Sequence, residues 1–400
     1  MKALAFALLA LLPLTSFAAR ETAAADPYGV RYELPTHAPG VVRTAGWSAH
    51  AATLGARQTT TVIERSGAAF VKVYFDHVDL PAGWQLVVSH RDSGERYVYD
   101  GRGQGERTVD TDIGQNGVTS FAAMSITGDH AIVQLLPPRD ATAARTQPQV
   151  VISHVMEGYP DAVLDEVRDT GLLTGGEPGN RAICGVDNKQ RPACYSGNAF
   201  NRSRAVARLL INGGSCTGWR IGTGDRMMTN NHCIGSAADV AATEVWFNFQ
   251  HSACSGTATN TVTKVSGRSL LRTSAPLDYT LFTINNASSV SGFGFLSIDP
   301  RMPGANEQIY IPQHPGGRLK EISVNSSSDT GGKCKVFQTQ VGDGFSYYCD
   351  TEPGSSGSPV IASSNNKVIG LHFRGPCPNG ATRISRIWQE ISGLFNNQVP

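Results

Sequence analysis

Three short segments of the chain carry the residue types that acyl transfer requires, in the order His, Asp, Ser. Their central residues are His232, Asp278 and Ser356. A serine hydroxyl is a weak nucleophile near neutral pH, so a nearby imidazole has to accept its proton and pass it to the leaving amine. A buried carboxylate has to hold that imidazole in one tautomer and stabilise its charged form. Together the three segments predict a Ser-His-Asp hydrolase.

The segment around Ser356 also has glycines where a sharp turn needs them. Gly354 and Gly357 allow the backbone to project the Ser356 side chain. The same turn can aim the N–H groups of Gly354 and Ser356 at one point, where they would stabilise an oxyanion. Taken singly, a His beside a Cys, an Asp in a half-apolar strand and a Gly-Ser loop each have a structural explanation. Their combination in this order favours catalysis.

Composition limits the class of protein that can carry these residues. The 400-residue chain is 40% hydrophobic and 17% charged, with a net charge of +1. Such a chain is long enough for two or three domains and too apolar for a disordered protein. Its balanced charge excludes a strong nucleic-acid footprint or a polybasic membrane surface. The 43 glycines favour β structure.

The cysteines divide the chain into two parts. All eight lie between Cys184 and Cys377, and the first 183 residues contain none. An even number of cysteines in one part predicts a disulfide-bonded domain preceded by a separate segment. Zinc binding is the competing explanation, but no CxxC pair is present, so we expect no metal site and no cofactor.

The first 18 residues have the composition of a secretory signal peptide. Lys2 precedes an apolar run, residues 3–14, and cleavage is expected after Ala18, with Ala25 as the alternative site. The run is too short to span a bilayer. We therefore expect a soluble, secreted protein, which agrees with the predicted disulfides.

Strand-like segments occur in both parts. Those at 60–63, 69–75, 84–88, 96–99 and 130–136 predict a β-sandwich over about 52–138. Residues 137–183 are expected to be a connector with a short helix at 161–167 and a Gly/Pro-rich link at its end. Further strands are expected at 206–211, 243–249, 278–284, 308–311 and 367–373, and a C-terminal helix at 387–395. The fold class is therefore all-β with one terminal helix.

Residues 182–400 resemble the chymotrypsin-like serine proteases, and most closely the secreted bacterial lysyl endopeptidases. The resemblance covers a little over half of the chain and rests on residues 231–233, 277–281 and 351–359. It implies a double β-barrel with the triad between the barrels. His232 would be the general base, Asp278 the orienting carboxylate and Ser356 the nucleophile, with an oxyanion hole at Gly354 and Ser356.

The resemblance also implies a disulfide pattern. Cys216 and Cys233 would anchor the histidine loop, as a bridge of this spacing does in chymotrypsin-like proteases. Lysyl endopeptidases tie the mature N-terminus to distant loops, and Cys334 and Cys349 remain to close a small loop. The expected pairs are Cys184–Cys377, Cys194–Cys254, Cys216–Cys233 and Cys334–Cys349.

The part before the first cysteine is expected to be a propeptide, residues 19–181, that inhibits the protease or assists its folding. A permanent binding module is the alternative. Arg181 and Arg168 are candidate processing sites. Vertebrate-type chymotrypsin-like enzymes have an Asp before the nucleophile that pairs with a freed N-terminal amine. This chain has Ser355 there, as lysyl endopeptidases do, so that activation switch is not expected.

The sequence leaves two alternatives for the side chain that the enzyme prefers at the cleavage site. Asp350 lies six residues before Ser356, where trypsin-like enzymes have the Asp at the base of the specificity pocket. This favours cleavage after Lys or Arg. His372 and Thr351 resemble pocket residues of glutamyl endopeptidases, and Arg374 would also suit an acidic side chain. Because lysyl endopeptidases carry the same His and Thr, we expect basic specificity, with acidic specificity as the alternative.

Two other functions are weighed against a secreted serine endopeptidase acting on proteins or peptides. A catalytically silent, protease-like binding protein would have lost His, Asp or Ser, and all three are present. An esterase of the α/β-hydrolase type would have a Gly-x-Ser-x-Gly elbow and the opposite order of Asp and Ser. We expect a monomer that binds no nucleic acid and no membrane.

Overall fold

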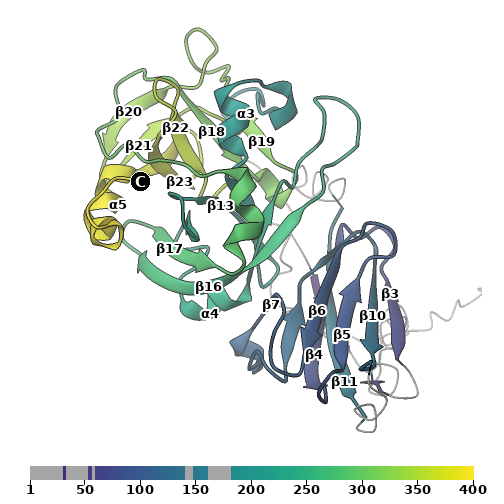
Figure 1. Ribbon diagram of the computed structural model, residues 1–400. Helices are drawn as coiled ribbons and strands as arrows, with labels where there is room; N and C mark the ends of the chain where they lie inside the picture. The colour runs from purple at the N-terminus through teal and green to yellow at the C-terminus, as the bar shows by residue number, and fades with distance from the viewer. Residues whose placement is uncertain (1–29, 33–52, 56–58, 140–146, 161–181) are drawn as a thin grey trace, which may run out of the picture.

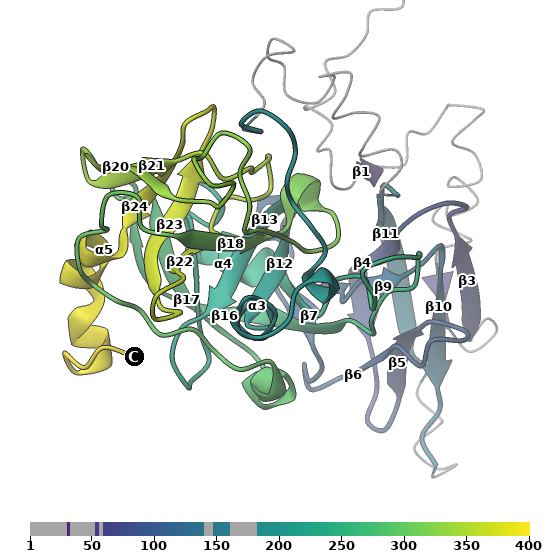
Figure 2. The same ribbon diagram turned by 90° about the horizontal axis from the view of Figure 1, so that it is seen from above.

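The computed structural model describes residues 30–32, 53–55, 59–139, 147–160 and 182–400. Figures 1 and 2 show them as an N-terminal lobe of strands beside a larger C-terminal lobe. The expected signal peptide, the helix at 161–167 and the processing sites Arg168 and Arg181 lie outside the described residues. None of the described helices is long and apolar enough to cross a membrane.

The N-terminal lobe is a sandwich of two antiparallel sheets. One has the order β1-β11-β4-β8-β7, with β2 paired to β11 and β9 to β4, and the other has the order β3-β10-β5-β6. Successive side chains of a strand point to opposite faces of its sheet. Accordingly, every second residue of β10 is buried, including Ala131, Val133 and Leu135. The elements are β1 (Val30–Tyr32), β2 (Thr53–Leu54), β3 (Thr60–Glu64), β4 (Phe70–Asp79), β5 (Gln85–Ser89), β6 (Arg96–Asp100), β7 (Arg107–Thr108), η1 (Thr111–Ile113), β8 (Phe121–Ala123), β9 (Ile126–Thr127), β10 (His130–Leu136) and β11 (Gln149–Gly158).

The sandwich extends beyond its expected end at residue 138. Strand β11 lies in the segment that was expected to be a connector, and it pairs with β4 along nearly its whole length. Val150, Ile152 and Val155 of this strand are buried in the sandwich core. The expectation was wrong here because Pro137 and Pro138 end one strand, and the chain then returns to form another.

The C-terminal lobe begins with a closed six-stranded barrel in the order β12-β13-β14-β17-β16-β15. Its core contains Leu209, Phe247 and Phe282, among others. The strands are β12 (Val206–Ile211), β13 (Gly214–Arg220), β14 (Arg226–Thr229), β15 (Thr243–Phe247), β16 (Thr263–Ser274) and β17 (Tyr279–Ile284). Short helices accompany them: η3 (Pro192–Cys194), α3 (Asn198–Ser203), α4 (Ala237–Ala242) and η4 (Ala287–Phe293).

The second half of this lobe is a seven-stranded antiparallel sheet in the order β19-β18-β22-β23-β24-β21-β20. Its elements are β18 (Ile309–Gln313), η5 (Pro315–Gly317), β19 (Glu321–Ser323), β20 (Val336–Val341), β21 (Gly344–Tyr347), β22 (Pro359–Ala362), β23 (Val368–Arg374), β24 (Asn379–Arg383), α5 (Ile384–Ile391) and η6 (Ser392–Phe395). The expected all-β class is confirmed, with one closed barrel and one seven-stranded sheet in this lobe where two barrels were expected. The terminal helix begins three residues earlier than expected, at Ile384.

Three of the four expected disulfides are present: Cys184–Cys377, Cys194–Cys254 and Cys216–Cys233. The fourth is not formed, because Cys334 and Cys349 are free, buried thiols. Burial raises the pKa of both thiols.

The sandwich packs on the outside of the first barrel through buried charges. Lys72 Nζ of β4 lies 2.5 Å from Glu244 Oε1 of β15, and the Ser125 hydroxyl donates to Glu244 Oε2 at 2.6 Å. Lys264 Nζ of β16 donates to the Ser125 carbonyl at 2.7 Å and pairs with Glu95 at the same distance. Burial raises the pKa of the Glu244 carboxyl, but Lys72 and Lys264 outweigh it, so the net shift is downward. This interface therefore contains an ion network in which Lys72, Glu244 and Lys264 are almost completely desolvated.

We expect Lys72→Ala to destabilise the full chain by about 3–5 kcal/mol, because it removes one cation from the buried Glu244 carboxylate. Urea unfolding, with Ser356→Ala as the parent to prevent self-digestion, measures this effect. Arg102→Ala is the matched control, since the Arg102 side chain is 82% exposed and its pairing with Asp100 is a surface contact. Equal midpoints for both variants would show that the ion network contributes nothing to stability.

Candidate active site

Strand pairing brings His232 and Asp278 together. β14 ends at Thr229 and pairs antiparallel with β17, so that Thr229 lies opposite Thr280. His232 follows the end of β14, and Asp278 immediately precedes β17. The Asn230 side chain fixes this corner by donating to the Asp278 carbonyl at 2.7 Å. The two candidate residues therefore meet because their flanking strands are neighbours in the barrel.

The carboxylate of Asp278 holds His232 through two contacts. Asp278 Oδ2 lies 2.7 Å from His232 Nδ1, and Asp278 Oδ1 accepts the His232 backbone N–H at 2.9 Å. The His232 side chain is 47% exposed and that of Asp278 only 19%. The imidazole is thus accessible to a substrate while the carboxylate is shielded. This contact orients the ring and favours a proton on Nδ1, which leaves Nε2 as the basic nitrogen.

The loop that carries Ser356 is packed against the first barrel. The Thr217 N–H of β13 donates to the Ser356 carbonyl at 2.8 Å. Gly357 has a φ of +87°, and a Cβ there would lie 2.1 Å from the Thr217 carbonyl and 2.4 Å from Thr229 Oγ1. Only glycine permits this approach. It places the Ser356 loop against the end of β14, three residues before His232.

The two N–H groups that are expected to form the oxyanion hole belong to Gly354 and Ser356. Gly354 has a φ of +89°, and a Cβ there would collide with the backbone of Gly317 and His314. Within the described part of the chain, neither the Gly354 N–H nor the Ser356 N–H donates to another residue. Both groups therefore remain free to bind a developing negative charge.

A pocket of about 180 Å³ opens next to Ser356. It contains the expected residues Thr351 and His372, and also Arg374, which the sequence had suggested as an alternative contact. Thr351 Oγ1 is buried without a partner in the described structure. The full lining is Ala182, Thr351, Glu352, Pro353, Ser356, His372, Phe373, Arg374 and Gly375.

His372 enters this pocket as a neutral ring. Its Nδ1 lies 2.6 Å from the hydroxyl of Tyr347. Burial, and to a lesser extent the neighbouring His232, lowers the pKa of His372 to about 3. His372 therefore supplies a polar but uncharged wall at neutral pH.

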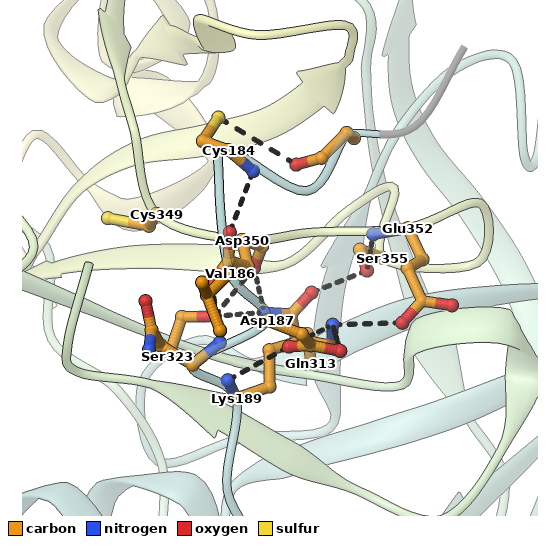
Figure 3. A network of polar contacts seen from close by, with 12 residues as sticks. Cys184, Val186, Asp187, Lys189, Gln313, Ser323, Cys349, Asp350, Glu352 and Ser355 are labelled. Carbon is orange, nitrogen blue, oxygen red and sulfur yellow. Dashed lines mark hydrogen bonds and ion pairs between the residues drawn. The ribbon is translucent and has the colours of Figure 1, made fainter. Parts of the chain in front are cut away.

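Asp350 is not among the residues that line the pocket, although the sequence placed it at the base. Its carboxylate is buried, with Oδ1 accepting the Cys184 N–H at 2.8 Å and Oδ2 accepting the Asn188 N–H at 2.7 Å (Figure 3). Burial raises its pKa, and these hydrogen bonds oppose that shift. Both carboxylate oxygens thus bind the backbone of the segment that begins at Cys184. Asp350 stabilises the fold there and does not form the base of the specificity pocket as the sequence had predicted.

Sequence reasoning missed Ala182 and Glu352 as pocket residues. The Ala182 carbonyl accepts the Thr351 N–H at 3.2 Å and the Asn379 side chain at 2.7 Å, which draws the start of the C-terminal lobe into the pocket wall. Nothing in the sequence indicates that contact. Glu352 lies inside the recognised motif, where a buried carboxylate implies a cation partner, but the sequence does not say which one.

A family model described as "Lysyl endopeptidase, C-terminal domain" matches residues 179–385, more than half of the chain. The chain belongs to the lysyl endopeptidase family. This confirms the resemblance inferred from the three motifs, and the C-terminal lobe is hereafter called the lysyl endopeptidase domain.

Two curated proteins are similar to the chain over part of its length. Secreted RxLR effector protein 73 of Plasmopara viticola is 34% identical over 285 residues, which is 66% of this chain and 66% of that protein. The uncharacterized protein y4fB of Sinorhizobium fredii (strain NBRC 101917 / NGR234) is 32% identical over 196 residues, covering 45% and 29%. The chain thus spans slightly less than two thirds of the first relative and under a third of the second.

Solved structures also match about half of the chain. A Glu endopeptidase in complex with MPD has 19% identity and a TM-score of 0.41, over 54% of this chain and 100% of that one. A serine endoprotease from Yersinia pestis has 11% identity and a TM-score of 0.38, over 50% and 66%. At these scores the likeness supports no inference about activity.

Proposed function

We propose that the chain is a serine endopeptidase that cleaves peptide bonds through an acyl-enzyme, with His232, Asp278 and Ser356 as its triad. The observation that carries this proposal is the paired contact of Asp278 with the His232 ring and backbone, beside a pocket that Ser356 lines. A carboxylate in that position keeps His232 Nε2 unprotonated and able to accept the hydroxyl proton.

The proposed reaction has two stages. Ser356 Oγ attacks the scissile carbonyl while His232 takes its proton, and the N–H groups of Gly354 and Ser356 bind the oxyanion. His232 then passes the proton to the departing amine, which leaves an ester on Ser356. In the second stage a water molecule attacks that ester, with His232 again as the base, and Ser356 is regenerated.

The pocket supports an acidic side chain on the acyl side of the cut best. Arg374 has no ion-pair partner among the residues that the structure describes, and Thr351 Oγ1 has a free hydrogen-bonding position. Glu352, the acid in the lining, is already paired with Lys189 and Arg318. A substrate carboxylate would therefore meet a cation and a hydroxyl, whereas a substrate ammonium would meet no free anion.

Cleavage after Lys or Arg is the second candidate. It is supported by the family, whose name describes lysyl endopeptidases. In this chain, however, Asp350 is bound to backbone N–H groups, so basic specificity would require another anion or a rearrangement of Asp350.

A digest of a denatured, reduced protein mixture, with cut sites identified by mass spectrometry, separates the two candidates. We expect cuts after Glu and Asp, and Arg374→Ala should lower kcat/KM for a Glu substrate by about tenfold, the loss of one charge-assisted contact. Arg386→Ala is the control, since Arg386 forms a surface ion pair with Asp343. Cuts after Lys, unaffected by Arg374→Ala, would establish basic specificity.

We also propose that the protein is exported and that residues 19–181 form its propeptide. The relative named as a secreted effector supports export, and so do the three disulfides. Arg181 and Arg168 remain the proposed processing sites. The propeptide's sandwich packs on the first barrel through Lys72 and Glu244, which supports a folding role.

A further inference from the structure

The loop from Asp350 to Ser356 is held by side-chain contacts as well as by backbone hydrogen bonds. It connects β21 to β22 without helix or strand structure of its own. Within it, the Ser355 hydroxyl accepts the Glu352 N–H at 3.1 Å and donates to Gln313 Oε1 at 2.5 Å. The Ser355 N–H in turn donates to the Glu352 carbonyl at 3.0 Å. Glu352 is therefore one of the residues that fasten the loop before Ser356.

The carboxylate of Glu352 is bound by two buried cations. Lys189 Nζ lies 2.9 Å from Glu352 Oε1, and the Arg318 guanidinium donates to both oxygens at 3.1 Å. The Lys189 side chain is 1% exposed and that of Glu352 is 4% exposed. Lys189 Nζ also contacts both oxygens of Asp187 at 2.8 Å (Figure 3). The Lys189 ammonium thus lies between an acid of its own segment and the acid of the nucleophile loop.

The segment that presents Lys189 is fixed independently of that ion pair. Asp350 accepts the backbone N–H groups of Cys184 and Asn188, and Cys184 is bonded to Cys377. The backbone of Gln190 exchanges hydrogen bonds with that of Ile322. The backbone is therefore fixed at Asn188 and at Gln190, the two neighbours of Lys189, and the Lys189 ammonium has a defined position.

We propose that Lys189 is a positioning residue for catalysis: it is a fixed internal cation that holds Glu352, and through Glu352 the turn that presents Ser356 and its N–H donors. Ser355 occupies the place where an Asp would bind a freed N-terminal amine, so the loop needs another source of charge. Because Lys189 is internal to the chain, this cation is in place before any cut ahead of Ala182. The inference rests on the proposed peptidase activity.

The test compares Lys189→Met, Lys189→Arg and Lys333→Met in the full-length, secreted protein. Lys333 is the matched control, because it is an exposed lysine whose ammonium contacts Asn325. We expect Lys189→Met to lower kcat by about tenfold or more, with KM changed less than about twofold, because a misplaced oxyanion donor affects the transition state more than binding. Lys189→Arg should recover most of the kcat, and Lys333→Met should equal the wild type.

A second readout is the rate at which a peptidyl phosphonate labels Ser356, which should fall in parallel with kcat. If Lys189→Met is not secreted in folded form, Glu352→Gln replaces it, since it removes the anion at constant size and should cause the same loss of kcat. An unchanged kcat, or a loss confined to KM, would overturn the positioning role. A wild-type protein that neither hydrolyses peptides nor reacts with the phosphonate would instead contradict the proposed peptidase function.

Discussion

Replacing Ser356 with Ala is expected to reduce kcat/KM for peptide hydrolysis by about 10⁶-fold. The substitution removes the only atom that forms the acyl-enzyme in the proposed mechanism, and the remaining groups give only the weak acceleration of an oxyanion site. The digest described above, read by mass spectrometry, measures the loss. If the chain processes itself, the same variant should also remain full length.

The control for this substitution is Ser363→Ala, which removes a hydroxyl from an exposed serine on the loop after β22. We expect it to keep wild-type activity. Ser356→Ala should unfold at the same urea concentration as the Ser363 variant, which would separate loss of chemistry from loss of fold. Retained hydrolysis in Ser356→Ala would identify a different nucleophile or a contaminating protease.

The substitution Asp278→Asn is expected to lower kcat by about 10⁴-fold near neutral pH, with little change in KM. In the structure, one oxygen of Asp278 faces His232 Nδ1 and the other accepts the His232 backbone N–H. An amide has only one oxygen. If it keeps the backbone contact, its NH₂ group faces Nδ1 and favours the tautomer with the proton on Nε2. Nε2 then cannot accept the proton of Ser356.

Asp343→Asn provides the comparison, because Asp343 is a half-exposed carboxylate paired with Arg386 at the surface. We expect its kcat to equal that of the wild type. The pH profile gives a further readout, since a reversed tautomer lowers kcat across the neutral range without removing the nucleophile. A loss of less than about tenfold in Asp278→Asn would mean that another group orients His232.

Local patterns in the sequence predicted much of the C-terminal lobe. Strand-like composition between glycines identified β12, β15, β17, β18 and β23, and most residues of each strand are buried. The three motifs led to the correct family. In the N-terminal lobe the same reasoning ended the sandwich at residue 138 and missed β11. This strand follows the Pro137-Pro138 pair and a stretch rich in polar residues.

The resemblance to the lysyl endopeptidases predicted three disulfides correctly, but not the state of the fourth pair. Cys334 and Cys349 lie close enough in the fold to share a hydrogen bond, yet they remain thiols. The environment of these two side chains is a property of the folded core and is not encoded in their separation.

The sequence by itself determined the β class, the family and the three short motifs that contain His232, Asp278 and Ser356, because each depends on residues a few positions apart. Only the tertiary structure decided the partners of the buried charges. In the fold, Asp350 accepts hydrogen bonds from the backbone N–H groups of Cys184 and Asn188, and Glu352 forms ion pairs with Lys189 and Arg318. A buried charge requires a partner, but that partner comes from whichever distant strand or loop the fold places beside it.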